Sequence, residues 1–149
     1  MKHRLITPGS PSAERTYAVI LETGDEFTRC LTHFAHEAGL SASHFTAIGA
    51  FSSVVLGYFE WDRKAYKRIP IDEQVEVVAL LGDIALGPHD GPVLHPHVTV
   101  AKSDGSAWGG HLLEGIVRPT LEILVMDSPA SLVRRFDPAT GLALLEGDA

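Results

Sequence analysis

Two histidines, His95 and His97, stand two residues apart in the apolar segment 93–101 and offer the most specific chemistry in the sequence. Alternate residues of a strand point to the same face, so the two imidazoles would lie side by side if this segment is a strand. Two imidazoles placed in this way can share a divalent metal ion. Pro96 lies between them and has no N–H for a sheet ladder, which predicts an edge strand or a bulge at this point.

His111 is the candidate for a third ligand, and the turn before it decides whether it can reach the other two. With a three-residue loop closed by Gly105 in the left-handed conformation, His97 faces His111 across an antiparallel pair. A two-residue loop would instead pair Val98 with His111 and turn the His111 side chain to the opposite face. Three histidines with an open fourth position are typical of catalytic zinc sites. The alternative is that these histidines are ordinary surface or interface side chains.

A few charged residues are candidates for a supporting role beside such a metal, which would act as a Lewis acid on a carbonyl or carboxylate group. Glu76 and Glu114 could serve as acid or base, or could equally be solvated or paired carboxylates on strands. In the three-residue-loop register Glu114 faces away from the histidines. Arg118 could bind an acidic substrate or simply lie on the surface. Gly109 and Gly110 would allow a close backbone approach or a bulge.

Length, composition and charge narrow the class of protein. The 149 residues have the size of one domain, and the apolar and charged shares, 45% and 21%, are those of an ordinary globular protein. A single cysteine, Cys30, excludes an internal disulfide. The net charge of −7 argues against direct nucleic-acid binding, because phosphate contacts require clustered Lys and Arg. No stretch has the pattern of a secretory signal or a membrane span, so the expected location is the cytoplasm.

One helix among a series of strands is expected to position these residues. Apolar residues recur with helical spacing from Phe27 to Ala38, residues 23–25 offer capping groups, and Gly39 is placed to end the helix. We expect a loose arm at 1–14 and a short helical turn at 129–136. Strands are expected at 16–22, 45–49, 53–61, 68–71, 74–81, 93–101, 107–114, 120–126 and 142–145. The pattern predicts a single α+β domain over residues 1–149.

Several segments, in this order, resemble the PPC domain, a family conserved in plants and prokaryotes. The similarity runs from about residue 17 to residue 145, and its most specific segments surround the three histidines. The matching segments are AIGAF (47–51), LGYFE (56–60), VEVVALLGDI (75–84), LHPHV (94–98), GGHLLEG (109–115) and 119–125 with Glu122.

The resemblance implies one main helix packed on a largely antiparallel sheet, a homotrimer, and a divalent metal, expected to be zinc, on His95, His97 and His111. The histidine layout also resembles that of zinc-dependent acetolactate decarboxylase, at the level of fold and ligand pattern. In plants the domain accompanies AT-hooks, whose Arg-Gly-Arg core this chain lacks. The plant role in DNA binding therefore does not transfer directly, although family members are often labelled as DNA-binding proteins.

Two functions remain open from the sequence. The first is a small metal-dependent enzyme with a small-molecule ligand near the metal, acting on a carbonyl or carboxylate compound. The second is a non-enzymatic trimeric module that works with DNA-binding or other protein partners. A third possibility is that the metal only stabilises the trimer.

Overall fold

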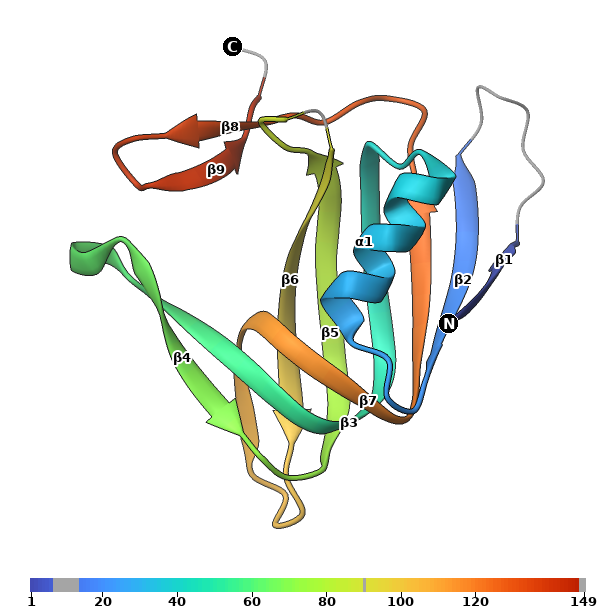
Figure 1. Cartoon of the computed structure of the whole chain (residues 1–149), viewed down its shortest axis with the longest axis vertical. Coiled ribbons are helices and arrows are strands. Elements are labelled where there is room, and N and C mark those ends of the chain that lie inside the picture. Colours follow the sequence, from blue (N-terminus) through green and yellow to red (C-terminus); the bar gives the residue numbers. More distant parts are fainter. Residues whose placement is uncertain (7–13, 90, 148–149) are drawn as a thin grey trace.

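The structure is a computed structural model that describes residues 1–6, 14–89 and 91–147 (Figure 1). Its elements are β1 (Lys2–Leu5), β2 (Arg15–Glu22), α1 (Phe27–Ala38), β3 (Ala42–Glu60), the short 3-10 helix η1 (Trp61–Arg63), β4 (Ala65–Ile71), β5 (Val75–Leu86), β6 (Pro92–Ala101), β7 (Ala107–Asp127), β8 (Arg134–Asp137) and β9 (Leu142–Leu145). One helix against a mostly antiparallel sheet confirms the predicted α+β class.

The main sheet holds seven strands in the order β1-β2-β7-β6-β5-β3-β4, while β8 and β9 form a separate hairpin. Strand β3 also pairs with β7, so that β7, β6, β5 and β3 close into a ring of paired strands. The two long strands bend at register shifts, one of which lies at Gly49. As a result, β7 leaves β6 beyond His111 and continues along β3 and β2.

Helix α1 forms because one of its faces is apolar and buries Phe27, Leu31 and Phe34 against the front of the sheet in Figure 1. Its N-terminus is capped by Glu26, whose carboxylate accepts hydrogen bonds from two backbone N–H groups, so the cap expected at 23–25 lies one residue later. Gly39, at φ 63°, ends the helix as predicted. Neither this helix nor another in the described chain has the length and apolar character to cross a lipid bilayer.

Four expectations about the elements are corrected. Residues 2–5 form an edge strand on β2 rather than a loose arm, and residues 7–13 of that arm lie outside the described residues. The strands expected at 45–49 and 53–61 are one strand, as are those at 107–114 and 120–126, because bulges let a strand bend without ending. The expected helical turn at 129–136 is wrong, since the residues from Arg134 pair with β9 across the turn at 138–141.

Candidate metal centre

The β6–β7 hairpin brings the three histidines together. The N–H of Lys102 donates to the carbonyl of Ser106 at 2.9 Å, and Gly105 has a φ of 81°, which closes a three-residue loop. His97 therefore lies directly opposite His111, and the register predicted from the sequence is confirmed. His95 follows on the same face of β6.

The imidazole nitrogens converge closely enough to share one ion. One ring nitrogen from each histidine lies within 4.8 Å of the other two. The Nε2 atoms of His95 and His97 are 3.2 Å apart. Two nitrogens bound to one tetrahedral metal ion at about 2.0 Å would be roughly 3.3 Å apart, so this pair is spaced closely enough to share an ion.

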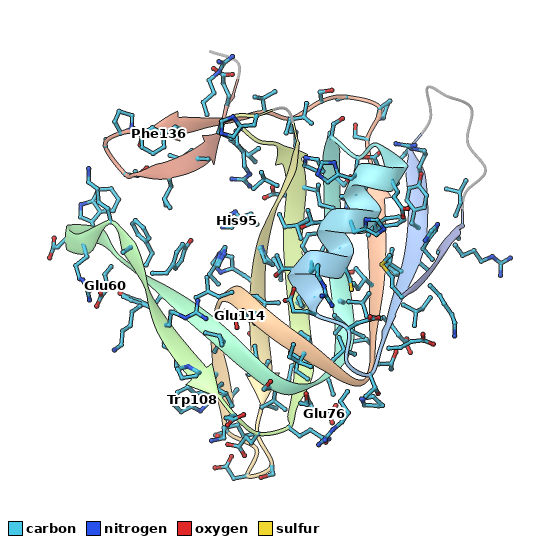
Figure 2. All side chains as sticks on the ribbon, viewed as in Figure 1. Glu60, Glu76, His95, Trp108, Glu114 and Phe136 are labelled. Carbon is cyan, nitrogen blue, oxygen red and sulfur yellow. The ribbon has the colours of Figure 1, made fainter. Side chains whose placement is uncertain are left out.

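The strand geometry leaves one side of this cluster open. Pro96 pairs with Gly82 of β5 on one side, while β7 pairs with β6 only from His97 onward. The sheet edge predicted at Pro96 is therefore confirmed on the side of β6 that faces β7. Figure 2 shows His95 projecting toward the side of the molecule where β4 and the β8–β9 hairpin lie.

Tyr66 on β4 forms one wall of the site. Its ring stacks on His111 with centroids 4.6 Å apart and an interplanar angle of 29°. Gly57 makes this possible, because a Cβ there would lie 2.8 Å from the Tyr66 ring. A Cβ on Gly110 would come within 2.7 Å of the Gly57 carbonyl oxygen, which confirms the close backbone approach expected at Gly109 and Gly110.

Burial keeps two of the histidines in the form that binds metal. It lowers the pKa of His111 to about 4, with charges on His95, His97 and Arg134 acting in the same direction. Burial, then the charge of His95, also lowers the pKa of His97. The Nδ1 of His111 is buried and has no hydrogen-bond partner among the described residues. A buried nitrogen without a partner, in a cluster of three imidazoles, fits a metal ligand set.

Asp83 and Arg134 form a pair next to His95, and neither was predicted from the sequence as a site residue. Asp83 is directly opposite His95 across β5 and β6, with its Oδ2 3.7 Å from the imidazole Nδ1. Its Oδ1 accepts a hydrogen bond from Nη2 of Arg134 at 2.5 Å. Burial would raise the pKa of Asp83, but its interactions with His95 and Arg134 outweigh it and hold that pKa below its usual range. Only the β5–β6 register, which no local motif encodes, could have identified Asp83.

The charged residues proposed from the sequence either pair elsewhere or lie far from the histidines. The carboxylate of Glu114 pairs with Arg68 of β4. Glu76 lies at the far end of the sheet from His95 in Figure 2. The guanidinium of Arg118 donates to the Gln74 side chain at 2.9 Å.

Comparison with solved structures finds proteins of the same fold over nearly the whole chain. A metal-containing protein of Archaeoglobus fulgidus is 33% identical, with 89% of this chain and 93% of that chain covered and a TM-score of 0.81. A candidate DNA-binding protein of Bacteroides thetaiotaomicron is 30% identical, covering 97% and 96% with a TM-score of 0.86. A plant- and prokaryote-conserved (PPC) protein of Pyrococcus horikoshii is 29% identical, covering 99% and 96% with a TM-score of 0.84.

This chain also matches parts of two longer proteins. A Staphylococcus aureus protein similar to alpha-acetolactate decarboxylase shares the fold at 15% identity, over 74% of this chain and 51% of that one, with a TM-score of 0.54. The bifunctional protein GlmU of Synechococcus sp. (strain JA-2-3B'a(2-13)) is 32% identical over 137 residues, and this chain spans 20% of its length. Residues 9–129 match the profile of the Plants and Prokaryotes Conserved (PCC) domain, and this chain belongs to that family.

Proposed function

We propose that this chain binds a divalent metal ion, zinc, through His95, His97 and His111. The observation that carries the proposal is the convergence of three imidazoles on one face of the β6–β7 hairpin, where burial favours the neutral form of two of them. Three histidines without a thiolate are a ligand set that zinc accepts readily. Similarity to a metal-containing protein at 33% identity supports the proposal.

The proposal extends to a metal-dependent reaction on a small carbonyl or carboxylate compound. Three protein ligands leave a position for such a ligand, and the exposed edge at His97 gives it access. A zinc ion held there would supply Lewis-acid chemistry. Tyr66 would offer such a ligand an aromatic wall beside His111.

Metal content tests the proposal. Elemental mass spectrometry of protein purified without a metal-binding tag is expected to give about one zinc ion per chain for the wild type and almost none for His97→Ala. The matched control is His33→Ala, because His33 is exposed on α1 and pairs only loosely with Glu37 at 3.5 Å. Wild-type protein that holds no metal, even after incubation with zinc, would contradict the proposed function.

A second candidate, a non-enzymatic trimeric module, is favoured by an exposed apolar face of the sheet. This face lies on the side opposite α1 and surrounds a hollow of about 520 Å³. Its exposed side chains include Ile48, Val78, Leu81 and Leu124, and the half-buried Ile20 also lines it. An apolar patch of this kind marks an interaction surface. We propose that copies of this chain cover it in a homotrimer, since the net charge of −7 disfavours nucleic acid as the partner.

Ile48→Lys is expected to convert the assembly to monomers, because Ile48 is 61% exposed on this face and a charge there cannot be buried against a second copy. Light scattering after size-exclusion chromatography measures the change. The control Trp61→Lys alters an equally exposed residue, 66%, in the η1 turn and should leave the assembly intact. A wild-type protein that is already monomeric at micromolar concentration contradicts the trimer.

The metal content of that monomeric variant separates the two roles of the metal. Leu81 of the apolar face lies directly opposite His97, so the proposed interface adjoins the metal centre. A monomer that keeps one metal ion per chain favours the enzyme. A monomer without metal favours an ion that serves the assembly.

A further inference from the structure

The β8–β9 hairpin is connected to the metal centre through two charged residues that are not ligands. We infer that Asp83 is a positioning residue for His95 and that Arg134 fixes Asp83, so that this hairpin sets the orientation of one metal-binding imidazole. The inference rests on the proposed metal site. Arg134 lies beyond residues 9–129, the part that matches the family profile.

The two nitrogens of His95 face different partners. Its Nε2 points to the cluster, 3.2 Å from the Nε2 of His97. Its Nδ1 is therefore the nitrogen that faces Asp83, at 3.7 Å from Oδ2. This separation is longer than a hydrogen bond, so the attraction in this arrangement is electrostatic. A carboxylate on that side favours the tautomer with the proton on Nδ1, which leaves the lone pair of Nε2 for a metal.

Arg134 holds the carboxylate in that position. Its side chain is 6% exposed and is tied at two points, by Nη2 to Oδ1 of Asp83 and by Nη1 to the carbonyl oxygen of Ala143 at 3.1 Å. One carboxylate oxygen is thus taken by the guanidinium while the other faces His95. The planar fork of an arginine fixes a carboxylate in a way that a flexible ammonium group does not.

The hairpin itself is anchored at both ends, so it can act as a fixed support. At its base, the N–H of Leu86 in β5 donates to the carbonyl of Leu132 at 2.8 Å. At its tip, Nζ of Lys64 donates to the carbonyl of Pro138 at 2.9 Å, which joins the hairpin to the β3–β4 turn. Figure 2 shows the hairpin, with Phe136 labelled, on the side of the molecule toward which His95 projects.

The test compares Asp83→Asn and Arg134→Met with Arg135→Met. The control removes an exposed arginine of the same strand, which pairs with Glu146 rather than with β5. Two quantities are measured, the tautomer of His95 in the metal-free protein by imidazole ¹⁵N NMR, and zinc affinity by competition with a chromophoric chelator. Thermal melts establish that each variant is folded, and Arg134→Lys serves in place of Arg134→Met if the latter does not fold.

Asp83→Asn is expected to move the proton of His95 from Nδ1 toward Nε2 and to weaken zinc binding about 10- to 100-fold. Arg134→Met should weaken it several-fold, and Arg135→Met should change neither quantity. Unchanged zinc affinity and an unchanged tautomer in Asp83→Asn would overturn the inference. A wild-type protein that binds no zinc, but whose His95 tautomer depends on Asp83, would remove the proposed metal site and leave the positioning role standing.

Discussion

The metal-free protein is expected to lose stability as the pH falls from about 6.5 to about 4, with His111 as a main cause. The pKa of His111 is lowered from 6.5 to about 4 in the folded chain by burial and by its charged neighbours. Between these values the unfolded chain binds more protons than the folded one, so the free energy of unfolding decreases with decreasing pH. The shift corresponds to on the order of 2–3 kcal/mol, after allowance for the partial exposure of the ring.

Urea unfolding of chelator-treated protein at several pH values between 7.5 and 4 measures this loss. The comparison variant is His111→Gln, which keeps a polar side chain and does not titrate. Its stability should fall less over the same window, whereas the carboxylates that titrate near the acid end contribute equally to both proteins. The variant and the wild type losing the same free energy would show that His111 titrates normally. His97→Gln should also reduce the loss of stability at low pH, but by less than His111→Gln does.

The histidine cluster could be predicted because its geometry is local. Residues two apart on a strand share a face, and a glycine at position 105 selects the three-residue loop that pairs His97 with His111. Helix α1 could be predicted for a similar reason, since its apolar spacing and its final Gly39 lie within one short segment. In both cases a few neighbouring residues decide the structure.

The residues that surround the histidine cluster could not be predicted, because their positions depend on pairing between distant strands. Asp83 meets His95 only after the β5–β6 register shifts between Val77 and Ala79, and a shift of one residue would turn the carboxylate away. Arg134 lies in a segment whose sequence indicated a helical turn, and its strand forms through pairing with β9. Tyr66 contacts His111 from β4, a strand distant in the sequence, and it can do so because Gly57 has no side chain.

The full lengths of β3 and β7 also could not be predicted from the sequence. The sequence predicts two short strands in each case, with gaps at residues 50–52 and 115–119. Instead β3 and β7 run through these positions with register shifts and bend around the core. The same bends let β7 pair with β6 near His111 and with β2 near its end, which creates the open edge beside the histidines.

Gly82 is expected to be a position where even one added methyl group disrupts the fold and the metal centre together. A Cβ there would lie 2.3 Å from the carbonyl oxygen of His95 and 2.6 Å from Cζ of Phe45, a backbone atom and a buried ring that cannot easily move. Gly82→Ala should therefore lower the free energy of unfolding by more than about 3 kcal/mol, as measured by urea denaturation. Zinc binding should be lost as well, because the added atom would push β6 away from β5 at the histidine itself.

The matched control for Gly82→Ala is Gly91→Ala, which lies in the connection between the same two strands. A Cβ on Gly91 would be 3.5 Å from the nearest atom of His36, an ordinary van der Waals contact, so the change should be within about 0.5 kcal/mol. Equal stability of the two variants would mean that β5 and β6 do not approach each other at Gly82 in this register. Asp83 would then no longer face His95, because both contacts depend on the same pairing of Gly82 with Pro96.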